Sequence, residues 1–272
     1  MELKVTTYEV DGDTATLTLS RPHRRNAWTG RMHTEFRWLM AQAEADPGVR
    51  AVIVTGAGTD FCVGADTEAL QGHADKGGYD PGTPTDLAMP GYGVQPEFDQ
   101  NFAWMMALRT TTVAAVNGAV AGVGLVLACF CDLRFAAATA KVTTAHGPIG
   151  LPAEYGLSWL LPRQIGLTRA NDLLLSSRIF EASEVADWGL FNQVVPAAEL
   201  SSTVAAYTRR LLDRVAPHSQ ATTKRQIYLD QHRDVGTSVA ESDRLLDAAM
   251  REPDYREGVR ALIERRAASW AR

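Results

Sequence analysis

The chain has 272 residues, of which 46% are hydrophobic, and its formal net charge is −5. This length allows one large domain, or a domain with a helical appendage. The negative charge argues against a nucleic-acid-binding protein, so we expect no nucleic-acid partner.

Cysteine usage bears on compartment and metals. Three cysteines, Cys62, Cys129 and Cys131, are too few for a disulfide framework in a chain of this size. None has a His or Cys partner at the spacing of a zinc site, so we expect no metal. The N-terminal sequence MELKVTTYEVDGD lacks the basic-then-apolar order of a signal peptide. We therefore expect buried thiols and a cytoplasmic protein.

Strand and helix patterns alternate along the first two-thirds of the chain. The first half predicts a hairpin at residues 4–20, a helix that Thr29 caps at 29–46, a buried strand at 49–58, a short helix at 60–70 and an irregular stretch at 71–97. A helix at 96–110, a second buried strand at 112–118, a helix at 121–130 and two short strands within 132–146 follow. Two helices at 155–166 and 168–180 and a helix–turn–strand unit at 182–196 complete this part.

The chain from residue 197 onward predicts three or four helices and no strand. The fold class is therefore α/β, with a core at residues 1–196 and a helical region at residues 197–272. Residues 110–131 carry no charge and are long enough to span a membrane. Asn117-Gly118 interrupts them, so we expect a strand, a turn and a buried helix, and no membrane partner.

Two glycine-containing loops, Phe61–Asp66 and Asn117–Gly124, follow the two buried strands and lead into helices. Glycine lets a backbone turn tightly, and the N–H groups at a helix start have no partner within the helix. Two such N–H groups that converge on one oxygen would form an oxyanion hole, which stabilises an anionic intermediate. Close packing of two turns is the alternative explanation.

Six stretches carry a resemblance that spans nearly the whole chain: LSRP…RNAW, VIVTGAGTDFCVGAD, VAAVNGAVAGVGLVLACFCDLRFAA, GLPAEYGLSWLLPRQIG, ASEVADWGLFNQVV and EPDYREGVRALIERR. Their order and spacing closely resemble the enoyl-CoA hydratase/isomerase family of the crotonase superfamily. The resemblance implies a spiral of ββα units, a C-terminal helical region that mediates trimerisation, and often a dimer of trimers. It also implies an acyl-CoA thioester substrate, with coenzyme A as part of that substrate and no separate cofactor.

Matched by position, the resemblance places the two oxyanion-hole N–H groups on Ala65 and Val123. It also implies a set of residues that bind the CoA or acyl portion. This set comprises Arg24, Arg25, Cys62, Val63, Gly64, Asp66 and Gly122. The two arginines are candidates for the CoA phosphates, although they could equally be surface charges.

Typical hydratases of this family use two glutamates to add water, and this chain carries neither. The matching positions hold Val126 and His146, and a valine can neither accept nor donate a proton. Glu154 is the remaining candidate, because several relatives hold an acid there and an apolar pocket would raise its pKa. Its alternative role is to favour a helix dipole. His146 is the second candidate for the proton carrier, because a histidine gains or loses a proton near neutral pH. Its alternative is an ordinary structural role.

One proton carrier suffices to move a proton between two carbons, so the residues favour an isomerase over a hydratase. Three alternatives stay open: an enoyl-CoA hydratase as similarity would name it, a hydrolase of acyl-CoA or C–C bonds, and a non-catalytic acyl-CoA-binding paralogue. We expect residues 71–97 to shape the acyl pocket, with Tyr79, Met89 and Tyr92 as contacts.

Overall fold

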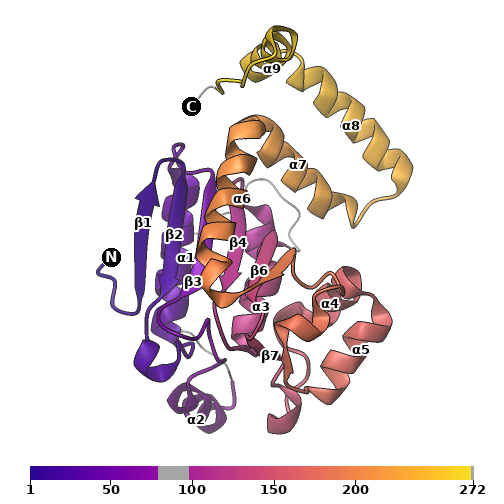
Figure 1. The fold of residues 1–272 in the computed structure, drawn as a ribbon. Coiled ribbons are helices and arrows are strands. Elements are labelled where there is room, and N and C mark those ends of the chain that lie inside the picture. Colours follow the sequence, from indigo (N-terminus) through magenta and orange to yellow (C-terminus); the bar gives the residue numbers. More distant parts are fainter. Residues whose placement is uncertain (79–97, 271–272) are drawn as a thin grey trace.

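The computed structural model describes residues 1–78 and 98–270, and two sheets organise them (Figure 1). The larger sheet has six strands in the order β1-β2-β3-β4-β6-β9, and the smaller has three in the order β5-β7-β8. The strands are β1 Thr6–Asp11, β2 Thr14–Leu19, β3 Ala51–Gly56, β4 Thr111–Val116, β5 Val120–Ala121, β6 Leu133–Ala137, β7 Lys141–Thr143, β8 Phe180–Glu181 and β9 Gln193–Val195.

The expected hairpin and parallel strands are present. β1 and β2 pair antiparallel around Gly12, whose φ of 61° suits the tight turn. From β2 onward the larger sheet is parallel, and all six residues of its central strand β4 are buried. Because β3 and β4 are parallel neighbours, the loops that follow them leave the same edge of the sheet.

Helices cover the sheet and continue beyond it. They are α1 Gly30–Ala45, α2 Thr67–Lys76, α3 Val123–Phe130, α4 Leu157–Ile165, α5 Leu167–Ser176, α6 Leu200–Arg214, α7 Pro217–Asp230, α8 Val235–Ala249 and α9 Pro253–Glu264. Thr29 caps α1 as expected, since its Oγ1 accepts a hydrogen bond from the Met32 N–H at 3.2 Å. After β9 the described chain is helical, and α8 and α9 project away from the sheet (Figure 1).

The uncharged stretch at residues 110–131 forms β4, β5 and α3, as the sequence predicted. Every side chain of α3 is buried, which explains its continuous apolar character. Within the described ranges, no helix has both the length and the apolar character needed to cross a membrane.

The prediction of a helix over residues 96–110 is wrong for the part that the structure describes. Only a 3-10 segment forms there, Ala103–Ala107. It is bounded by Phe102 with φ 60° and by the extended residue Leu108, so a regular helix has no room to develop. Tyr79, Met89 and Tyr92, the expected acyl contacts, lie outside the described residues.

A buried polar cluster joins the helical region to the core. Lys224 on α7 lies 2.7 Å from Asp132, and the hydroxyl of Tyr228 donates to the same carboxylate at 2.7 Å. Burial and the neighbouring carboxylate raise the pKa of Tyr228 well above its ordinary value. The N–H of Thr112 at β4 also donates to Asp132, at 2.7 Å. This carboxylate thus ties α7 to the central strand.

Replacing Asp132 with Ala should lower the free energy of unfolding by about 3 kcal/mol, because Lys224 would remain buried without its counter-ion. Urea denaturation followed by circular dichroism measures this difference. The matched control is Glu241→Gln, which breaks an exposed pair with Arg244 and should leave the midpoint nearly unchanged. Equal midpoints for Asp132→Ala and the wild type would show that the cluster does not anchor α7.

Candidate active site

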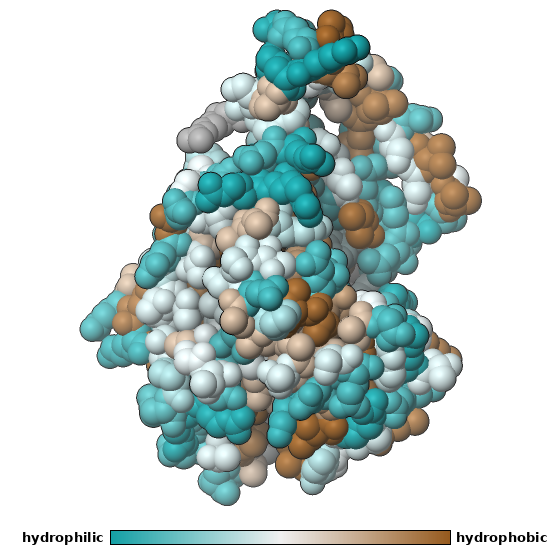
Figure 2. Space-filling view, in the orientation of Figure 1, coloured by the Kyte–Doolittle hydropathy of each residue, from teal (hydrophilic) through white to brown (hydrophobic). Residues whose placement is uncertain are grey.

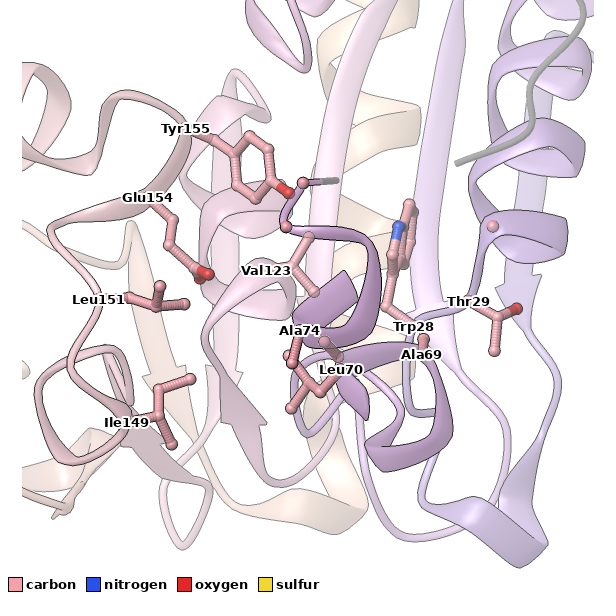
Figure 3. A pocket seen from close by; sticks show the side chains of 14 residues that line it. Trp28, Thr29, Ala69, Leu70, Ala74, Val123, Ile149, Leu151, Glu154 and Tyr155 are labelled. Atoms are coloured by element: carbon pink, nitrogen blue, oxygen red, sulfur yellow. The ribbon is translucent and has the colours of Figure 1, made fainter. Parts of the chain in front are cut away.

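A cavity of about 550 Å³ lies between α2, the start of α3 and the segment before α4 (Figure 3). Its wall is mainly apolar. The lining residues that matter for chemistry or shape are Trp28, Ala65, Leu70, Val123, Glu154 and Tyr155. The structure therefore brings the two predicted N–H donors and the predicted carboxylate to one cavity.

The cavity depends on a close approach of two turns that follow β3 and β4. The N–H of Cys62 donates to Ala119 O at 3.2 Å, and the N–H of Ala121 donates to Cys62 O at 2.9 Å. A Cβ on Gly124 would stand only 2.3 Å from Cys62 O, and one on Gly118 only 1.8 Å from Thr59 O. Only glycine at these two positions lets the backbones approach this closely.

Ala65 and Val123 present backbone N–H groups at this junction. The N–H of Trp28 donates to Gly64 O at 2.8 Å, and the N–H of Asp66 donates to Trp28 O at 2.8 Å. These two hydrogen bonds engage the carbonyl of Gly64 and the N–H of Asp66, which flank Ala65. The N–H of Ala65 itself takes part in neither. Val123 is the first residue of α3, so its N–H has no acceptor within the helix. The part of the chain that the structure describes offers an acceptor to neither N–H.

Glu154 points its carboxylate toward the Val123 side of the cavity (Figure 3). Its Oε2 would lie 3.6 Å from a Cβ placed on Gly122, the residue before Val123. The side chain is half-buried, and among the described residues it has no hydrogen-bond or ion-pair partner. Burial raises the pKa of this carboxyl, and the nearby His146 acts in the opposite direction. Glu154 accepts no N–H from α4, and it lies in the 3-10 turn just before that helix.

The two positions that replace the usual glutamates do not line the described part of the cavity. Val126 is fully buried within α3. His146 is 7% exposed, and its Nδ1 is buried without a hydrogen bond. The backbone oxygen of His146 accepts from the N–H of Leu151 at 3.1 Å, which helps to hold the segment that carries Glu154.

The predicted CoA-binding residues surround the cavity without lining its described surface. Asp66 is 3% exposed and pairs with Arg21 at 3.0 Å and Arg24 at 3.1 Å. Burial opposes ionisation, but the hydrogen bonds from Arg24, the Glu68 N–H and Arg21 prevail and lower the pKa of Asp66. Its carboxylate is therefore engaged inside the protein.

The remaining members of the CoA-binding set differ in exposure. Arg25 pairs with Asp60 at 2.8 Å, and its side chain is 60% exposed. The thiol of Cys62 is fully buried, which raises its pKa to about 12. Val63, Gly64 and Gly122 belong to the two turns themselves. Among the charged side chains in this set, the arginines are therefore the ones that reach solvent appreciably, and Val63 is half-buried.

Sequence reasoning missed the aromatic and aliphatic lining residues. Trp28 directly follows the loop Arg25-Asn26-Ala27, and Tyr155 directly follows Glu154. Their position next to predicted site residues was the one sequence feature that could have indicated them. Tyr155 has φ 44° and ψ 33°. This left-handed conformation is uncommon for a tyrosine, so the sequence does not predict it. Leu70 and Ile149 had no signal, because they reach the cavity only through the fold.

Three comparisons define the class of protein. The sequence profile of the family described as enoyl-CoA hydratase/isomerase matches residues 9–272. The 1,2-epoxyphenylacetyl-CoA isomerase of Escherichia coli K12 is 33% identical over 267 residues, which cover 95% of each chain. A solved enoyl-CoA hydratase of Polaromonas sp. JS666 superposes with a TM-score of 0.84 at 26% identity, covering 98% of this chain and 99% of that one.

These matches, with the two turns and the cavity already described, define a crotonase-type enzyme fold. The chain belongs to the enoyl-CoA hydratase/isomerase family. It is thus an enzyme of a family whose substrates are acyl-CoA thioesters and whose members are hydratases or isomerases. The fold class and the family resemblance inferred from the sequence are both confirmed.

Replacing Gly124 with Ala should lower the free energy of unfolding by about 2 kcal/mol and reduce turnover, because its methyl group would push against Cys62 O. Gly72→Ala is the matched control. Its Cβ would meet nothing within 4 Å on α2, so this variant should fold at least as stably as the wild type. Thermal unfolding and a turnover assay read both effects, and an active Gly124→Ala enzyme of normal stability would contradict the close-approach argument.

Proposed function

We propose that this enzyme is an acyl-CoA isomerase in which one carboxylate moves a proton between two carbons of the acyl group. The N–H groups of Ala65 and Val123 bind the thioester oxygen. The Glu154 carboxylate removes a proton from C2 of a 3-enoyl thioester, and the electron pair of that C–H bond delocalises onto the oxygen. The protonated Glu154 then returns the proton to C4, and the double bond comes to lie between C2 and C3.

The observation that carries this proposal is that Glu154 is the only carboxylate among the described lining residues of the cavity. Water addition in this family uses a second group, and neither Val126 nor His146 is among the described residues that line the cavity. A single carboxylate with a raised pKa can accept a proton and give it back. The residues therefore suit isomerisation better than hydration.

The proposed oxyanion hole supplies the electrostatic part of catalysis. Each N–H donor in such a hole is worth about 2.7–4 kcal/mol of transition-state stabilisation. The mainly apolar wall strengthens these hydrogen bonds, because little solvent screens them. Positioned dipoles and one proton carrier complete the chemistry, so the proposal requires no cofactor or metal beyond the CoA that the substrate carries.

We propose that the CoA moiety lies along the outer side of the first turn. Arg24 and Arg25 would contact its phosphates, and their side chains are 38% and 60% exposed. Cys62, Val63, Gly64, Asp66 and Gly122 would contribute through the backbone. The buried thiols and the acyl-CoA chemistry support a cytoplasmic location.

We also propose that residues 1–196 hold the site and that residues 197–272 mediate self-association as a trimer or a dimer of trimers. Exposed apolar side chains on α8 and α9 support this, and brown areas lie among teal ones at that end of the molecule in Figure 2. They include Leu246, Val259, Leu262 and Ile263, with Leu262 79% exposed. A patch of this kind is typical of a protein interface.

The first test compares crotonyl-CoA with a 3-enoyl-CoA as substrates of the wild type, Glu154→Gln and His146→Ala. We expect the wild type to convert the 3-enoyl thioester to the 2-enoyl thioester and Glu154→Gln to lose at least 100-fold in rate. His146→Ala should retain most of the activity. Absorbance and mass spectrometry identify the products. Efficient hydration of crotonyl-CoA that survives both substitutions would refute the proposal.

The pH dependence provides a second test. A base acts only when ionised, so kcat/KM should fall as pH falls through the pKa of Glu154, which burial raises above the ordinary 4.5. The acid limb should therefore lie above that value and should disappear from the residual activity of Glu154→Gln. An acid limb of the same midpoint in the Glu154→Gln profile would assign the proton carrier to another group.

A further inference from the structure

A second cavity of about 450 Å³ shares Tyr155 with the catalytic cavity. Its lining is rich in aromatic and apolar groups. These include Phe98, Met106, Phe130, Trp159 and His232. The proposed proton transfer does not use it.

The chain itself passes from one cavity to the other within three residues. Glu154 lines the first cavity, Tyr155 lines both, and Gly156 lines the second. Consecutive Cα atoms are about 3.8 Å apart, so the second cavity begins within roughly 7.6 Å of the Glu154 Cα. An acyl chain of a few carbons beyond the reacting centre spans that distance.

Aromatic rings lie in contact from one cavity to the other. Phe102 contacts Tyr155 edge to face, with ring centroids 5.5 Å apart. The same ring lies 5.7 Å from Trp28 in the first cavity and 6.4 Å from Phe130 in the second. The rings of Phe102 and Tyr155 therefore connect the aromatic walls of the two cavities.

The second cavity suits an uncharged flat group. Trp159 stacks on His232 with centroids 5.8 Å apart and planes 9° apart. Phe98 meets His232 edge-on at 5.8 Å. Aromatic faces and edges bind another ring in stacked or edge-to-face geometry. The described lining residues include no carboxylate, lysine or arginine, and the Arg163 guanidinium behind them is stacked on the Trp159 ring, 4.1 Å from its centroid.

Tyr155 has a backbone conformation that L-residues avoid, with φ 44° and ψ 33°. A left-handed conformation at a bulky residue costs about 1 kcal/mol or more and persists where the surroundings enforce it. Here it places the tyrosine ring between the two cavities. Glycine would adopt this backbone without strain, so the ring rather than the backbone explains the residue type.

We infer that the second cavity binds the distal end of the acyl group, and that the preferred acyl groups end in an aromatic ring or another flat ring. This inference rests on the proposed function only in placing the thioester oxygen at Ala65 and Val123. The acyl chain passes beside Tyr155, and its ring packs against Trp159. Tyr155 is then the residue that sets the length and width of the acyl group.

Binding of unreactive thioethers tests the inference apart from turnover. We would measure the Kd of S-butyl-CoA and S-(4-phenylbutyl)-CoA by titration calorimetry. The phenyl group should tighten binding to the wild type about tenfold or more, through ring burial. Trp159→Ala should remove that gain and leave S-butyl-CoA unchanged, and Trp159→Phe should restore much of it. Trp188→Ala, which lies outside both cavities, should behave as the wild type, and thermal unfolding checks each fold.

Tyr155→Gly provides an independent variant because it removes the ring without straining the backbone. It should admit wider groups, so the Kd of a naphthylbutyl thioether should improve relative to the phenylbutyl one. If S-butyl-CoA binds but the phenyl group adds nothing, the inference is wrong while the proposed isomerase stands. Equal losses for both thioethers in Trp159→Ala would also overturn it. Isomerisation that persists in Glu154→Gln would instead refute the proposed function and leave these Kd values unaffected.

Discussion

The close approach of two backbone turns is the constraint on which the rest of the site depends. The turns leave the same edge of the sheet because β3 and β4 are parallel neighbours, an edge where open α/β sheets commonly bind ligands. Absence of a side chain at Gly118 and Gly124 lets them touch. The helix α3 begins at Val123 beside the first turn, and Ala65 and Val123 both line the cavity at the junction.

Polar side chains hold the first turn in place, and this explains residues that look functional in sequence. Asn26 donates to Ala57 O at 2.9 Å and to Asp60 O at 2.8 Å. Asp66 lies between two arginines and is almost fully buried. An ionised carboxylate next to Ala65 thus fixes the position of that N–H. A side chain can therefore serve the site by holding the backbone in place, so a sequence motif alone does not separate binding residues from structural ones.

The sequence predicted the alternation of strands and helices, the buried β4 and α3, and the two turns, because each has a local signal in periodicity or glycine placement. It failed over residues 96–110, where helical spacing formed only a short 3-10 segment. It also missed the role of Tyr155, since a left-handed tyrosine has no local signature. That Glu154 faces Gly122 depends on the path of the whole chain between them, and no local pattern encodes such a path.

Burial of Glu154 links stability to the proposed chemistry. A raised pKa means that the folded state binds this proton more tightly than the unfolded state does. Stability from this group is therefore greatest at acid pH and falls as pH rises from the unfolded pKa toward the folded one. Once ionised, the carboxylate destabilises the fold, and burial increases its basicity. Among the described residues that line the cavity Glu154 is the one carboxylate, so one group with a raised pKa can accept and return the same proton.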